Sequence, residues 1–85
     1  MTYRVEILPS ARRELAGLDP QTRKRIDKRI LLLAETPRPA GVKALQGQRG
    51  LLRLRVGDYR VVYAVRDDVL VVTVVRVGHR REVYR

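Results

Sequence analysis

The fold of this 85-residue chain is decided by residues 51–85, which read LLRLRVGDYRVVYAVRDDVLVVTVVRVGHRREVYR. β-Branched and aromatic residues alternate here with polar ones, a pattern typical of half-buried strands. The strand-forming runs are residues 52–56, 60–66 and 69–77. The short polar pairs Gly57-Asp58 and Asp67-Asp68 separate these runs and have the length of hairpin connections. The stretch therefore predicts an antiparallel meander.

Alternation along the first two runs assigns a face to each side chain. Arg53 and Arg55 occupy the polar positions of the first run, and Arg60 shares its predicted face with Val62 and Ala64. The side chains predicted to face the core are Leu52, Leu54, Val56, Val61, Tyr63 and Val65. The third run is apolar on both faces, which favours a central strand flanked on both sides.

Two helices are predicted between an N-terminal strand at residues 2–8 and this meander. Pro9 ends the strand, and Ser10 has the residue type of an N-cap for a short helix that ends near Leu18. Asp19, followed by Pro20, is expected to cap a second helix that runs to about residue 35. Its predicted buried stripe consists of Ile26, Ile30 and Leu33.

Residues 36–41, TPRPAG, contain the helix-breaking residues that end this helical part. Residues 42–50 show no clear period, so we expect a loop with Leu45 tucked into the core. The order β-α-α-β-β-β predicts an α+β fold: a small antiparallel sheet packed on a helical hairpin. A chain of this length forms one domain, residues 1–85.

The composition favours a polyanionic or acidic partner. The chain has 19 Lys and Arg against 9 Asp and Glu, a formal net charge of +10, and only Lys24, Lys28 and Lys43 are lysines. Arginine binds phosphate through two parallel hydrogen bonds. A merely solvated basic surface is the alternative that composition leaves open. The absence of cysteine and the single histidine exclude a Cys-based or all-His metal site, so we expect no metal or cofactor. We also expect a cytoplasmic protein, because no signal peptide or bilayer-spanning run is evident.

Short hairpins place Arg53, Arg55 and Arg60 on neighbouring strands, with same-face residues about 7 Å apart along a strand. These guanidinium groups then lie within reach of one nucleotide. Such a cluster can stabilise the charge that gathers on phosphoryl oxygens when an RNA 2′-hydroxyl attacks the adjacent phosphate. This reaction needs no metal ion.

The C-terminal tail supplies the remaining candidates. Gly78 is expected to end the last strand, so that His79, Arg80 and Arg81 bend over the rim of the arginine face. Tyr84 can stack on a base or donate to a phosphate. Arginine is a poor general base, so His79 is the first candidate for proton transfer, with Tyr84 and Glu82 as alternatives. The residues alone leave structural roles open: a solvated strand face for the arginines, a surface turn for His79 and core packing for Tyr84.

Residues 52–65, LRLRVGDYRVVYAV, and 74–85, VVRVGHRREVYR, resemble the RelE/ParE superfamily of toxins from type II toxin–antitoxin systems. The resemblance extends to the opening YRVEILPSARRELAGLDP and implies a microbial RNase-like fold. For the RelE branch it implies a metal-independent mRNA endoribonuclease that acts in the ribosomal A site. The catalytic residues that the resemblance implies are Arg53, Arg55, Arg60, Arg80 and Tyr84, with His79 or Arg81 as alternatives to Arg80.

The same resemblance implies partners: the ribosome and mRNA, and an antitoxin of the RelB kind whose acidic segment wraps the basic surface. Operator DNA would be bound only through the antitoxin complex, and no membrane is implied. ParE toxins, which poison DNA gyrase, share the fold and form the first alternative. A non-catalytic nucleic-acid-binding module, using the same arginines and Arg81, is the second.

Overall fold

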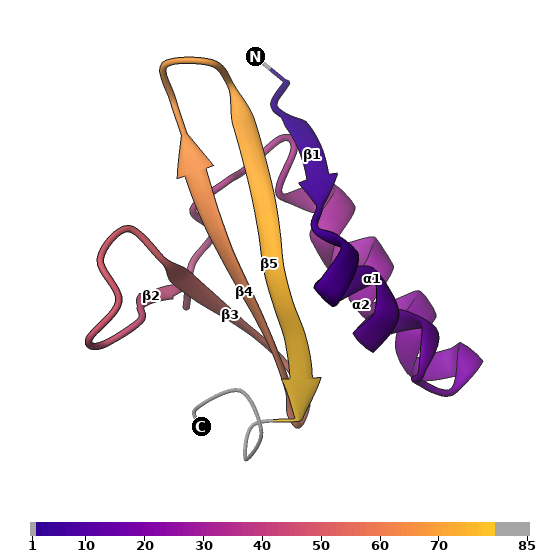
Figure 1. Cartoon of the computed structure of the whole chain (residues 1–85). Helices are drawn as coiled ribbons and strands as arrows, with labels where there is room; N and C mark the ends of the chain where they lie inside the picture. The colour runs from indigo at the N-terminus through magenta and orange to yellow at the C-terminus, as the bar shows by residue number, and fades with distance from the viewer. Residues whose placement is uncertain (1, 80–85) are drawn as a thin grey trace.

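The computed structural model describes residues 2–79, which form two helices and a five-stranded sheet (Figure 1). In chain order the elements are β1 (Arg4–Ile7), α1 (Pro9–Ala16), α2 (Pro20–Leu32), β2 (Lys43–Ala44), β3 (Leu52–Val56), β4 (Tyr59–Arg66) and β5 (Val71–His79). Both helices lie on the same side of the sheet (Figure 1). The α+β fold predicted from the sequence is therefore confirmed.

The strand order is β1-β5-β4-β3-β2, and every pair is antiparallel except β1 with β5, which is parallel. β5 is flanked on both sides, as its apolar faces predicted, but β4 takes the central position. The expectation that Gly78 ends the last strand is wrong. Gly78 pairs with Arg60, and His79 pairs with Tyr59, so the strand continues through both residues. The strand also starts later, because Leu70 adopts a positive φ of 55° and belongs to the preceding turn.

The two helix starts differ in how they are capped. Asp19 caps α2 as predicted, because its carboxylate accepts from the Thr22 amide at 3.1 Å. Hydrogen bonds with the Thr22 side chain and with the Thr22 amide lower the pKa of Asp19. The predicted Ser10 cap is wrong, because α1 already begins at Pro9 and Leu8 occupies the cap position. Proline suits the first helical position since its missing amide hydrogen has no partner there. The Ser10 hydroxyl instead donates to the Val75 carbonyl at 3.2 Å.

The core lies between the helices and one sheet face. Leu15 comes from α1, and Ile26 and Ile30 come from α2. Leu33 follows directly after α2, which confirms the buried stripe predicted for this helix. The sheet residues buried against them are Leu54, Val56, Val61, Tyr63, Val72, Val74 and Val77. The faces of β3 and β4 are therefore those that the alternation predicted, and Arg53, Arg55 and Arg60 belong to the opposite face.

Residues 42–50 are not wholly a loop. Lys43 and Ala44 pair with β3 as a two-residue edge strand, too short to show a period in the sequence. Leu45 is only partly buried and stays outside the core cluster, whereas Val42 packs against it. The assignment of Leu45 to the core is therefore wrong, because β2 ends at Ala44 and a turn follows at residues 46–47.

The linker before β2 is fixed to the sheet at two points. The Tyr63 hydroxyl donates to the Pro37 carbonyl at 2.7 Å. Arg38 donates to both carboxylate oxygens of Asp67, at 3.2 and 2.9 Å, and the Tyr3 hydroxyl donates to the same carboxylate at 2.6 Å. These bonds determine where the chain enters β2, and so where Lys43 lies.

Candidate nucleic-acid interface

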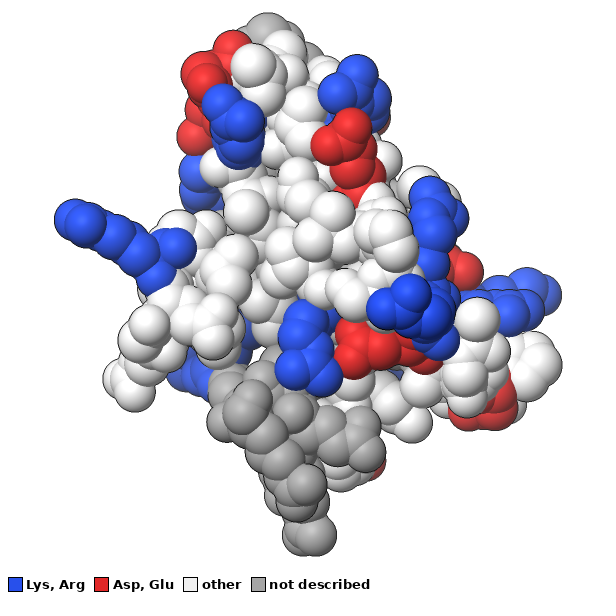
Figure 2. Space-filling view, in the orientation of Figure 1, with Lys and Arg blue, Asp and Glu red and all other residues white. Residues whose placement is uncertain are grey.

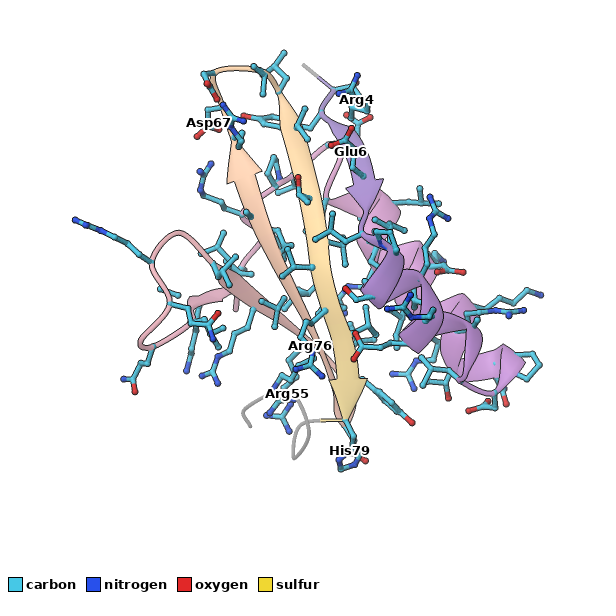
Figure 3. The ribbon with its side chains drawn as sticks, viewed as in Figure 1. Arg4, Glu6, Arg55, Asp67, Arg76 and His79 are labelled. Atoms are coloured by element: carbon cyan, nitrogen blue, oxygen red, sulfur yellow. The ribbon has the colours of Figure 1, made fainter. Side chains whose placement is uncertain are left out.

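Basic side chains lie in several places on the face seen in Figure 2, with acidic groups mostly beside them. Three of the salt bridges join Arg4 to Glu6 at 3.2 Å, Arg38 to Asp67 at 2.9 Å, and Arg66 to Asp68 at 3.0 Å. Asp67, Arg4 and Glu6 lie toward one end of the sheet, whereas Arg55, Arg76 and His79 lie toward the other (Figure 3). The predicted strand arginine Arg55 therefore lies at the second end, away from Asp67 and Glu6.

The β3–β4 hairpin sets two arginines against each other. Arg55 and Arg60 are direct cross-strand partners, on either side of a tight turn in which Gly57 adopts a φ of 60°. Like charges placed directly opposite each other destabilise a sheet. Arg60 is also buried, with 8% of its surface exposed, and its guanidinium donates to the Tyr59 carbonyl at 3.4 Å. A buried cation beside a second cation is the arrangement expected of an anion-binding site.

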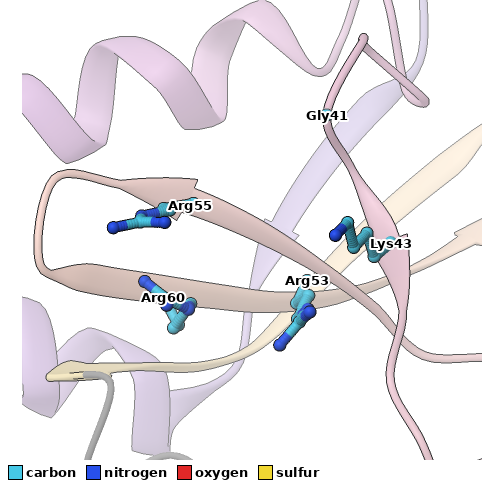
Figure 4. A pocket seen from close by; sticks show the side chains of 5 residues that line it. All are labelled: Gly41, Lys43, Arg53, Arg55 and Arg60. Carbon is cyan, nitrogen blue, oxygen red and sulfur yellow. The ribbon is translucent and has the colours of Figure 1, made fainter.

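These arginines line a cavity of about 250 Å³ (Figure 4). The residues around it are Gly41, Lys43, Arg53, Arg55 and Arg60. Four of the five carry a positive charge, and none of these described lining residues is a carboxylate. The structure therefore brings together the three predicted strand arginines, and its chemistry suits a phosphate group.

Lys43 is the member of this cluster that sequence reasoning missed. It reaches the cavity because β2 pairs with β3 and sets Lys43 opposite Arg53. The available signal was weak: a lysine between Val42 and Ala44, within a segment that has no strand period. Only the pairing of β2 shows that this side chain belongs beside the arginines.

His79 does not line this cavity. It pairs with Tyr59, which packs against the core, so both lie on the helix side of the sheet while Arg60 lies on the other. The two rings meet edge to face with centroids 5.7 Å apart. His79 lines a separate cavity of about 460 Å³, together with α1 residues such as Arg13 and Glu14. The other tail candidates, Arg80, Arg81, Glu82 and Tyr84, lie outside the described residues.

Arg76 has a structural partner that the sequence did not identify. Arg76 pairs with Glu14 of α1 at 3.0 Å. The Glu14 carboxylate also accepts from the Val77 amide at 2.9 Å. Glu14 thus accepts hydrogen bonds from both a side chain and a backbone amide of β5, in the part of β5 that extends past its pairing with β1.

The helical hairpin on one sheet face and the cationic cavity on the other make this a small basic α+β domain. The chain belongs to the family described as the ParE toxin of the type II toxin-antitoxin system, parDE, whose model matches residues 5–84. This confirms the resemblance to the RelE/ParE superfamily.

Relatives and solved structures agree with this assignment. The chain is 30% identical over 86 residues to Toxin RelG of Mycobacterium tuberculosis, covering 100% of this chain and 99% of the relative. The archaeal RelE–RelB complex from Pyrococcus horikoshii contains a chain 31% identical, with a TM-score of 0.83 and coverage of 96% and 99%. The isolated E. coli RelE toxin is also 31% identical, with a TM-score of 0.78 and coverage of 96% and 90%. Within residues 2–79, the two helices are too short or too polar to cross a membrane.

Proposed function

We propose that this toxin is a ribosome-dependent endoribonuclease that cleaves mRNA during translation. The observation that carries the proposal is the convergence of Lys43, Arg53, Arg55 and Arg60 on one cavity. The similarity to toxins named RelE and RelG supports the same reading. A site of this charge would bind the RNA backbone, and a bound phosphate would offset repulsion between its cations.

In the proposed reaction, the 2′-oxygen of one nucleotide forms a bond to the adjacent phosphorus as the bond to the 5′-oxygen breaks. Arg60 is the group best suited to stabilise the phosphoryl oxygens, because its burial restricts its motion and lowers competition from water. Arg53 and Arg55 would hold the backbone and orient the 2′-hydroxyl. Arg80 would add a further phosphate contact and Tyr84 would stack on or hold a base.

The 2′-hydroxyl proton needs an acceptor and the departing 5′-oxygen needs a donor. Guanidinium groups stay protonated and cannot act as the acceptor. His79 lines the cavity on the helix side, away from the arginines, which argues against it as the base. Tyr84 and Glu82 are therefore the side chains to test first for proton transfer.

The proposed partners are the ribosome with its mRNA, and a RelB-like antitoxin. Toxins with this fold form the RelE–RelB complexes found among the similar structures. The net charge of +10 supports an acidic antitoxin segment over the cationic cavity. Operator DNA would be bound through the antitoxin, and the site of action would be the cytoplasm.

Mapping mRNA 5′ ends after induction of the toxin tests this proposal directly. We expect new ends inside translated reading frames, with growth arrest. The double variant Arg60→Ala, Arg80→Ala should retain its circular dichroism spectrum while losing both effects, and Lys24→Ala on α2 should behave as wild type. Unchanged toxicity of the double variant would rule out this site.

Gyrase poisoning is the second candidate function, because the matching family model is described as a ParE toxin. Plasmid supercoiling and the SOS response separate the two candidates. Loss of supercoiling with intact translation and uncut mRNA would establish the ParE-like activity and remove the ribonuclease proposal.

A further inference from the structure

The cationic cavity continues into a second one. An adjoining cavity of about 430 Å³ is lined by Lys43, Ala44, Leu45, Gln46 and Arg53. Lys43 and Arg53 line both cavities, so the two meet at this pair. A groove therefore leads from Arg60, past the edge of the sheet, to the segment that follows β2. An RNA strand bound at the first cavity extends beyond one phosphate, and it could continue along this groove.

The pair at the junction repeats the arrangement at the first cavity. Lys43 and Arg53 are direct cross-strand partners, as are Arg55 and Arg60. Two like-charged pairs on adjoining strands oppose sheet pairing, and bound anions would relieve this repulsion. Lys43 and Arg53 line the adjoining cavity and offer a second phosphate two cations, as Arg55 and Arg60 do for the first.

The backbone at Lys43 is held in place before any ligand binds. Upstream, Pro37 accepts a hydrogen bond from Tyr63, and Arg38 donates to Asp67. Val42 packs against the core, and Lys43 itself pairs with β3. Downstream, the Leu45 amide donates to the Leu51 carbonyl at 2.9 Å. A cation on a fixed backbone loses less freedom on binding than one on a mobile loop.

We infer that the second cavity binds the nucleotide next to the scissile linkage, and that Lys43 contacts the phosphate joining that nucleotide to the strand. Gln46 supplies the amide that can hydrogen-bond the base or sugar of this nucleotide. The inference rests on the proposed function, since it assigns a second subsite to the same RNA strand. It makes Lys43 a substrate-contacting residue beside the strand arginines.

The experiment combines Lys43→Ala with removal of one phosphate charge. Ribosomes are programmed with mRNAs that carry a 2′-deoxynucleotide at the cleavage position, so that the strand binds without being cut. In matched mRNAs, an uncharged methylphosphonate replaces one of the two linkages that flank the scissile one. Dissociation constants are measured for wild type and for Lys43→Ala on each mRNA, which gives a double-mutant cycle.

We expect Lys43→Ala and one of the methylphosphonates each to weaken binding by about tenfold, the order expected for loss of a charged hydrogen bond. Together they should weaken binding no more than either alone. Multiplying effects at both flanking linkages would overturn the inference, because Lys43 would then contact something other than these phosphates. Lys43→Arg should restore the sensitivity to the methylphosphonate.

Lys24→Ala is the matched control, since Lys24 is an exposed lysine on α2 that lines neither cavity. It should keep wild-type binding and the full methylphosphonate effect. Failure of the proposed function looks different from failure of this inference: wild type itself would then leave unmodified mRNA uncut on ribosomes. If wild type cuts and Lys43→Ala binds like Lys24→Ala, only the Lys43 subsite is lost.

Discussion

Arg55 on β3 and Arg60 on β4 face each other directly across the hairpin, and both line the same cavity. Arg55 is exposed and donates from Nε to the Gly57 carbonyl at 3.3 Å, whereas Arg60 is buried. Two like charges therefore stand directly opposite each other in the sheet, at the place where the proposed substrate phosphate would bind. Stability and activity should therefore respond in opposite directions when this pair is changed.

Replacing Arg55 with glutamine should lower mRNA cleavage without destabilising the domain. The change removes the repulsion between Arg55 and Arg60. The hydrogen bond from Arg55 to the Gly57 carbonyl is exposed, so its loss should cost little stability. We expect the free energy of unfolding in urea to stay unchanged or to rise by up to about 1 kcal/mol. Arg23→Gln on α2 is the control for losing one surface charge. A decrease of more than about 1 kcal/mol would show that Arg55 has a structural role.

Asp67 should make the linker attachment sensitive to acid. Hydrogen bonds from Arg38 and Tyr3 lower the pKa of Asp67 from 3.8 to about 2. A pKa lowered by folding means that the stabilisation is present above pH 4 and is lost as the pH falls toward 2. The urea midpoints of wild type and Asp67→Asn should therefore differ at pH 6 and converge near pH 2. Parallel pH profiles would argue against this assignment.

Tyr63 should link stability to alkaline pH. Burial raises the pKa of Tyr63 from 10.0 to about 12. Because folding favours the protonated phenol, its contribution is complete below pH 10 and is lost as the pH rises through 12. Tyr63→Phe removes the hydrogen bond to Pro37 and should reduce the free energy of unfolding by about 1 kcal/mol at pH 7. The difference between the ultraviolet titrations of wild type and Tyr63→Phe should show a tyrosine that ionises near pH 12.

Glu14 should protect the end of β5. Glu14→Ala removes the acceptor for the Val77 amide and the partner of Arg76. We expect a loss of about 1–2 kcal/mol, at the lower end for charged hydrogen bonds because Arg76 is 43% exposed. Glu14→Gln keeps an acceptor and should lose less. Amide hydrogen exchange at Val77 gives the local readout, and unchanged exchange in Glu14→Ala would contradict the prediction.

Much of the fold follows from local pattern. The alternation in residues 52–66 places each side chain on its face because successive strand residues point to opposite sides. Asp19 and Pro20 mark the start of α2 because capping involves only the adjacent turn. The same local rule predicted the wrong cap at Ser10. Pro9 already occupies the first helical position, and the Ser10 hydroxyl donates to the Val75 carbonyl on β5.

The candidate site was only partly predictable. Arg53, Arg55 and Arg60 share a cavity because a tight turn joins their strands, so their proximity is nearly local. Lys43 joins them through pairing with β3, which the two-residue length of β2 concealed. His79 lies on the other face because β5 runs past Gly78 in register with β4, and no local pattern distinguishes that register from a strand end.

The sequence by itself determined the strand faces, the helical hairpin, the arginine cluster and the family motifs, because periodicity and capping act between near neighbours. Tertiary structure decided which groups from distant segments meet: Lys43 with Arg53, Glu14 with Arg76, and Arg38 with Asp67. Those contacts depend on strand register and on where the linker is attached, and both arise only when the whole sheet forms. The two-cavity groove beside Lys43 and Arg53 is therefore a property of the fold.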